Sequence, residues 1–176
     1  DAFIEARQQN GQILWSKSFD QYGYKDVALE LAIDGNQYIL LGSSEAGLNQ
    51  WEMASWYLRA DGTPLGYESG SRFTNSIDEL SDGHLTANGL IVVGQSAVNS
   101  QRDFKIYAFD FNRSLLWMDS YDRQGLDDYA LAFEETSSGN YIVTGASASV
   151  TTNSDALIRA YNGNGNILWT TILDFK

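Results

Sequence analysis

The fold is decided by one stretch of sequence that the chain uses more than once. Near its end the chain reads Asp155-Ala-Leu-Ile-Arg-Ala-Tyr-Asn-Gly-Asn-Gly-Asn-Ile-Leu-Trp169, and it begins Asp1-Ala-Phe-Ile-Glu-Ala-Arg-Gln-Gln-Asn-Gly-Gln-Ile-Leu-Trp15. The two stretches align without a gap and share Asp, Ala, Ile, Ala, Gly, Ile, Leu and Trp. Self-similarity of this kind is the signature of a repeat architecture.

The copies recur at a regular interval. A third copy ends at Trp117, and a fourth, weaker copy has Gly66 at the tryptophan position, so positions 15, 66, 117 and 169 are separated by 51, 51 and 52 residues. A second marker, an apolar run closed by glycine, keeps the same interval. It ends at Gly42, Gly94 and Gly145, which are 52 and 51 residues apart. Two independent markers on one period predict a repeat of about 51 residues.

Each period contains four strand-like segments separated by turn signals. In the last repeat we expect strands at 128–134, 141–145, 156–161 and 167–172, with turns at 137–140, 146–154 and 162–166. Runs such as Leu90-Ile-Val-Val93 are apolar on consecutive residues, which is typical of strands covered on both faces. We therefore predict an all-β fold of four-stranded antiparallel meanders, each of them a β-propeller blade, with a β-solenoid as the main alternative.

The period also predicts how the domain is divided. We expect one partial propeller domain over residues 1–176, with a half blade at 1–19 and blades at about 24–70, 76–121 and 127–174. Closed propellers have about 4–8 blades, and an open array of about three and a half leaves apolar blade faces uncovered. The missing part is expected in further segments of a longer chain or in further copies of this chain, as in a homo-oligomer.

These repeats resemble the tryptophan-bearing, quinoprotein-like propeller repeats that are common in secreted bacterial proteins. The matching segments are Asn162 to Trp169, Asp128 to Ala130 and Gly139 to Gly145. The resemblance covers the whole chain and implies that the Asp-x-Ala strand is innermost and the tryptophan strand outermost. It also implies an extracellular, periplasmic or cell-surface location. The middle repeat departs from the pattern, with Gly66 in place of tryptophan and Ile77 in place of the strand-opening aspartate.

Composition excludes several classes of function. The formal net charge is −12, with 11 basic residues against 23 acidic ones, which argues against nucleic-acid and anionic-membrane partners. Cysteine is absent, so disulfides, thiol catalysis and thiolate metal sites are excluded. No stretch reaches the ~18–20 apolar residues needed for a transmembrane helix.

A few residues carry possible binding chemistry. Trp15, Trp117 and Trp169 could stack on a ligand, but their periodicity favours packing between blades. Trp51 breaks the period and is expected in a loop, which makes it a candidate for ligand or partner contact. Asp122 and Asp127 precede an innermost strand, near the expected channel mouth. They could bind calcium or a substrate, although turn capping is the favoured interpretation.

No catalytic constellation is recognisable. His84 is the only histidine and is expected in an exposed loop, and the chain has no Gly-x-Ser-x-Gly nucleophile motif and no phosphate-binding loop. Neither a catalytic residue nor a cofactor is therefore expected. The leading hypothesis is a non-catalytic scaffold for binding or assembly with protein partners. The alternatives are a fragment of a propeller enzyme, such as a quinoprotein-like dehydrogenase, lyase or hydrolase, and a repeat subunit of a larger surface assembly.

Overall fold

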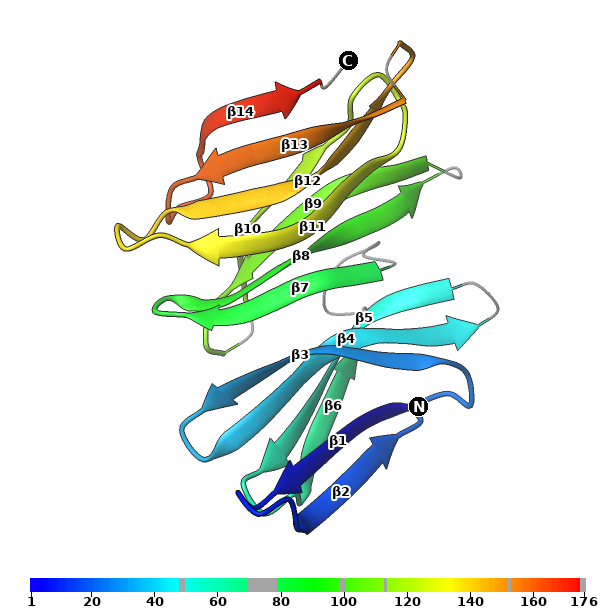
Figure 1. The fold of residues 1–176 in the computed structure, drawn as a ribbon, viewed down its shortest axis with the longest axis vertical. Coiled ribbons are helices and arrows are strands. Elements are labelled where there is room, and N and C mark those ends of the chain that lie inside the picture. Colours follow the sequence, from blue (N-terminus) through cyan, green and yellow to red (C-terminus); the bar gives the residue numbers. More distant parts are fainter. Residues whose placement is uncertain (48–49, 70–78, 99–100, 113, 152, 175–176) are drawn as a thin grey trace. The chain divides into compact units, whose positions relative to one another are not determined.

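The computed structural model describes residues 1–47, 50–69, 79–98, 101–112, 114–151 and 153–174. In these residues all regular structure is β, and fourteen strands form four antiparallel sheets (Figure 1). The predicted all-β fold of propeller blades is confirmed. The expected start of the second full blade at 76, and Ile77 with it, lie outside the described residues. The described part of the chain contains no helix that is long and apolar enough to span a membrane.

The chain divides into two compact units, Asp1–Glu79 and Leu80–Lys176. The first unit contains a two-stranded sheet, the half blade, and one four-stranded sheet in the order β3-β4-β5-β6. The half blade consists of β1 (Ala2–Arg7) and β2 (Ile13–Phe19). The full sheet consists of β3 (Asp26–Asp34), β4 (Gln37–Gly47), β5 (Gln50–Arg59) and β6 (Pro64–Ser69).

The second unit contains two four-stranded sheets, each built from consecutive strands. The first of them consists of β7 (Glu79–Thr86), β8 (Gly89–Val98), β9 (Gln101–Phe109) and β10 (Leu115–Tyr121). The last consists of β11 (Asp128–Glu135), β12 (Tyr141–Ser149), β13 (Asn153–Tyr161) and β14 (Ile167–Leu173). Strands 141–145 and 156–161 are therefore longer than predicted.

Apolar side chains pack between neighbouring sheets within each unit. In the first unit, Ala2 and Ile4 of the half blade share a core with Leu40, Trp56 and Leu58 of the full sheet. In the second unit, Ile91, Val93, Phe104 and Ile106 of one sheet share a core with side chains of the next. The side chains of the last sheet in this core are Ala130, Phe133, Tyr141, Val143, Leu157 and Tyr161. Burial of both sheet faces explains the unbroken apolar runs in the sequence.

The glycine marker of the repeat has a steric cause. Gly42 and Gly145 lie opposite Ala28 and Ala130 of the first strands of their sheets, next to a β-bulge in each case. A Cβ atom at Gly42 would lie 1.8 Å from the Val27 carbonyl oxygen, and one at Gly145 would lie 1.8 Å from the Tyr129 carbonyl oxygen. Glycine at a bulge permits this close approach of two backbones. Gly94 occupies the corresponding place in β8.

Candidate functional site

The tryptophan that marks the repeat binds to a turn of the following sheet in each unit. The Trp15 indole Nε1 donates a hydrogen bond to the Ala60 carbonyl oxygen at 3.3 Å. In the second unit, Trp117 Nε1 donates to the Gly163 carbonyl oxygen at 3.2 Å. Ala60 and Gly163 occupy the same position in the turn between the third and fourth strands of their sheets. We call this arrangement the tryptophan–turn contact.

The two turns that receive the indole share one backbone geometry. The amides of Arg59 and Asn162 donate to the carbonyls of Thr63 and Asn166, both at 2.9 Å. The fourth residue is glycine in each turn, Gly62 at φ 81° and Gly165 at φ 80°. A Cβ atom would lie 2.6 Å from the Trp15 ring at Gly62 and 2.4 Å from the Trp117 ring at Gly165. Glycine is thus required both by the left-handed backbone and by the indole above it.

Tyrosine rings of the receiving sheet complete the contact. The Trp15 and Tyr38 ring centroids lie 5.9 Å apart, and those of Trp117 and Tyr141 lie 6.0 Å apart. Trp117 also stacks on Tyr161, with centroids 5.9 Å apart and planes inclined by 23°. Aromatic pairs at these separations add to the stabilisation from buried area. Trp15 and Trp117 are therefore packing residues, in agreement with their periodicity, and for Trp169 this role stays a prediction.

Each end of the chain carries one half of a tryptophan–turn contact. The turn at Gln8 to Gln12 has the same hydrogen bonds as the receiving turns, 2.8 Å from the Gln8 amide to the Gln12 carbonyl and 2.9 Å from the Gly11 amide to the Gln8 carbonyl. Gly11 has φ 86°, and a Cβ atom there would meet nothing within 4 Å. At the other end, the Trp169 side chain is 45% exposed. The turn at Gln8 to Gln12 thus receives no indole from the described residues, and the Trp169 indole lies partly in solvent.

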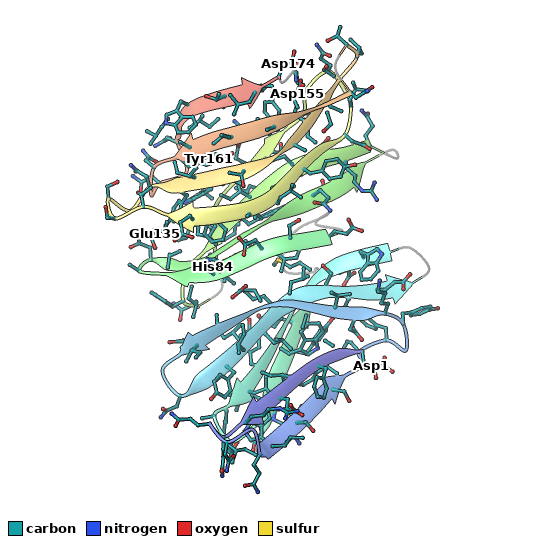
Figure 2. The ribbon with its side chains drawn as sticks, in the orientation of Figure 1. Asp1, His84, Glu135, Asp155, Tyr161 and Asp174 are labelled. Carbon is teal, nitrogen blue, oxygen red and sulfur yellow. The ribbon has the colours of Figure 1, made fainter. Side chains whose placement is uncertain are left out.

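A buried polar cluster lies between the two sheets of the second unit. Arg159 of β13 lies 3.1 Å from Asp119 of β10, and the Tyr161 hydroxyl, labelled in Figure 2, donates to the same carboxylate at 2.8 Å. The guanidinium also lies over the Tyr121 ring, 4.8 Å from its centroid. Burial raises the pKa of Tyr161 far above its ordinary value, so the phenol stays protonated and keeps donating. This cluster holds two blades together.

Asp122 and Asp127 both lie in the loop between β10 and β11, and both accept hydrogen bonds there. The Asp122 carboxylate accepts from the Gly125 amide at 2.8 Å. Asp127 accepts from the Arg102 amide at 2.9 Å and from the Tyr129 hydroxyl at 3.1 Å. These bonds support the loop and fasten it to β9, which is the turn-capping role that the sequence favoured.

Trp51 and His84 lie in strands, and the expectation that each sits in a loop is wrong. Trp51 belongs to β5, where it is half-buried, and the Lys25 ammonium lies 5.3 Å from its ring centroid. His84 belongs to β7, and its Nε2 lies 3.2 Å from Asp82 (Figure 2). The other Asp82 oxygen accepts the Phe133 amide at 2.9 Å, which links the first strands, β7 and β11, of two blades. Ladder pairing overrode the turn propensity of Asp-Gly in this segment.

Carboxylates gather in the equivalent loop of the first unit. Oxygen atoms of Asp1, Asp20 and Asp26 lie within 4.8 Å of one another, and oxygen ligands suit calcium. Hydrogen bonds within the loop account for two of the three residues. Asp20 accepts the Gly23 amide at 2.6 Å, while Asp26 accepts the Gln21 amide at 3.3 Å and the Ser44 hydroxyl. The arrangement repeats that of the loop between β10 and β11 and is explained by loop support.

Asp128, the counterpart of Asp26, is fully buried. One carboxylate oxygen accepts the Arg123 amide at 2.6 Å, and the other has no hydrogen-bond partner. Burial raises the pKa of this carboxyl above its ordinary value, and the charges of Asp122 and Asp103 add to the rise. Arg123 itself pairs with Asp155 at 2.6 Å. The loop is therefore a network of hydrogen bonds and an ion pair around one buried carboxyl.

The role of the receiving turns was not predicted from the sequence. The segment 162–166 was expected to be a turn, with no expectation that it receives an indole. The two spacings differ by one residue only, because the indole of Trp15 reaches a residue 45 positions later and that of Trp117 reaches one 46 positions later. Asp119, Arg159 and Tyr161 of the buried cluster have no identical residue at the equivalent positions of the other repeats, so the period does not identify them.

A comparison with protein-family models and with curated proteins returned no match for this chain.

Proposed function

We propose that this chain is a non-catalytic β-propeller scaffold, secreted or exposed at a cell surface, whose role is assembly with further propeller segments. The tryptophan-bearing repeats that it resembles supply the expected location. The proposal rests on one observation: equivalent apolar positions are covered on an internal sheet and uncovered on the last sheet.

Equivalent residues of an internal sheet and of the last sheet differ in their exposure to solvent. Ile91 and Ile106 face the following sheet and are only 2% and 0% exposed. Ile142 and Ile158 take the same places in the last sheet and are partly exposed. Trp169 and Leu173 of β14 lie on that side of the sheet and are 45% and 38% exposed. We call this set, with Thr144, Ala156 and Thr171, the trailing face. Apolar side chains grouped in this way are typical of interaction surfaces.

The half blade is uncovered on the side that faces away from the full sheet of the first unit. Ala2 and Ile4 of β1 are buried against the full sheet of the first unit, whereas Phe3, which alternates with them, is 57% exposed. Its counterpart in the last sheet, Leu157, is 0% exposed. We call Phe3, Glu5 and Arg7 of β1, with Leu14 of β2, the leading face. Within the described ranges β1 pairs with β2 and with no other strand, so its other edge offers backbone groups to an added strand.

The solution mass of the unmodified chain tests this proposal. Multi-angle light scattering after size exclusion, over a wide range of concentrations, is expected to give a mass above the chain mass of 19.5 kDa. The mass is expected to exceed that of one chain because a bound partner covers the leading and trailing faces. A folded chain that remains a monomer at all concentrations would contradict an assembly role.

A further inference from the structure

We infer that the occupant of both uncovered faces is a second copy of this chain, bound head to tail, with Trp169 of one copy seated on the Gln8–Gln12 turn of the next. The inference rests on the proposed function and names its partner. It extends a contact that the structure contains twice, once in each unit.

The turn is already formed in the free chain. Its two backbone hydrogen bonds and the φ of Gly11 match those of the turns at 59–63 and 162–166. The counterpart of the Ala60 and Gly163 carbonyls, which accept the indole N–H, is the carbonyl of Gln9. Because no loop has to be ordered, binding of an indole there avoids the entropy cost of induced folding.

The residue beside the turn supplies a second attraction. Arg7 occupies the position that Tyr161 has in β13, where the tyrosine ring stacks on Trp117. The Arg7 side chain is 54% exposed, pairs with Glu5 and donates to the Gly11 carbonyl at 3.0 Å. A guanidinium held flat in this place stacks well on a tryptophan ring. Among the described residues, no strand beside β1 carries a counterpart of the Tyr38 or Tyr141 ring, and Arg7 offers a stacking partner at this turn.

The two faces differ, so the contact is heterologous. The leading face has the turn and the trailing face has the indole, and neither face complements itself. A heterologous interface joins the head of one copy to the tail of another. It therefore predicts a result that a symmetric interface does not: two chains damaged at opposite faces can still bind each other.

Mixing two variants tests the inference. Trp169→Ala removes the indole and leaves the turn intact. Gly11→Asn leaves the indole intact and adds a side chain to the turn. At the equivalent Gly62 and Gly165, a Cβ atom would overlap the bound indole, so we expect the new side chain to block the Trp169 ring. Asparagine tolerates a positive φ, so the turn itself is kept. Each variant alone is expected to lose self-association by about thirtyfold or more, as for truncation of a central aromatic residue. An equimolar mixture is expected to form a one-to-one heterodimer.

Matched controls accompany the two variants. Gly139→Asn changes another turn glycine with positive φ, 73°, and open space around its Cβ, and it is expected to associate like the unmodified chain. Phe111→Ala removes an exposed aromatic side chain that belongs to neither face and is expected to do the same. Misfolded chains cannot rescue one another, so recovery on mixing also controls for folding. Sedimentation velocity measures the masses of all the samples.

The possible outcomes separate this inference from the proposed function. If the unmodified chain is monomeric, both fail. If it associates and neither variant weakens the association, assembly stands and the head-to-tail contact is wrong. If Trp169→Ala weakens association but Gly11→Asn does not, the indole binds elsewhere and the inference is overturned. Recovery on mixing supports it.

Discussion

At the scale of single residues, glycine decides where backbones and rings can approach each other. Gly42 and Gly145 admit a carbonyl oxygen of the neighbouring strand, while Gly62 and Gly165 admit an indole. The first pair explains why the apolar run in each repeat closes on glycine. The second explains why the outer turn carries glycine wherever a tryptophan packs on it.

Gly145→Ala tests the role of the bulge glycine. The new methyl group would overlap the Tyr129 carbonyl, which is backbone and cannot rotate away. We expect a loss of about 2–3 kcal/mol in the free energy of unfolding, measured by urea denaturation. Gly66→Ala is the matched control, because a Cβ atom at Gly66 meets nothing within 4 Å. Equal effects of the two substitutions would contradict this explanation.

Asp128→Asn tests the cost of the buried carboxylate. Because burial raises the pKa of Asp128, the folded chain holds this proton more tightly than the unfolded chain. The contribution of Asp128 to stability is therefore lost as the pH rises through the raised pKa. Asparagine still accepts the Arg123 amide and carries no charge. We expect the stability of the variant relative to the unmodified chain to increase from acid to neutral pH, and a constant difference would contradict this.

At the scale of elements, the strands of the last repeat could be predicted from the sequence because turn signals bracket apolar runs. The exception was the Ser/Thr/Asn-rich stretch 146–154, expected to be a turn. In the structure β12 continues to Ser149 and β13 begins at Asn153, and these two residues pair. Local turn propensity is weaker than a continuous ladder of backbone hydrogen bonds.

The candidate site was predictable only in part. Periodicity predicted that Trp15 and Trp117 are packing residues. It did not predict the turns on which they rest, because a contact between two blades leaves no pattern in the neighbouring sequence. Trp51 was placed in a loop because a residue off the period has no marker to fix its register, and His84 because the preceding Asp-Gly pair is a turn signal. The ion pair of Arg159 and Asp119 depends on two residues 40 positions apart that no repeat relates.

The turn between β13 and β14 provides a test at this scale. Gly165→Asn keeps the backbone conformation but places a Cβ atom against the Trp117 ring. We expect a loss of about 1–3 kcal/mol and a red shift of tryptophan fluorescence as the indole is displaced towards water. Gly139→Asn, in a turn that receives no indole, is expected to be nearly neutral. A neutral Gly165→Asn would show that the indole does not rest on this turn.

At the scale of the whole molecule, net charge opposes assembly while the uncovered faces favour it. Each copy carries a formal charge of −12, so two copies repel at a distance, and salt screens that repulsion. The contact itself is aromatic and apolar. We expect the association constant to rise when NaCl increases from about 0.05 to 0.5 M. Weakening by salt, measured by sedimentation, would indicate that ion pairs dominate the contact.

Both faces also account for the fractional number of blades. About three and a half blades do not close, and the proposed assembly would cover the uncovered leading and trailing faces.

An experimental structure of the assembled chain, by crystallography or electron microscopy, tests the central claim most directly. The expected result is that Trp15 and Trp117 lie on the turns at Gly62 and Gly165, and that Trp169 lies on the Gly11 turn of another copy, with its N–H on the Gln9 carbonyl. Repeat tryptophans lying away from these turns, or a Trp169 indole left in solvent within an assembled particle, would contradict it.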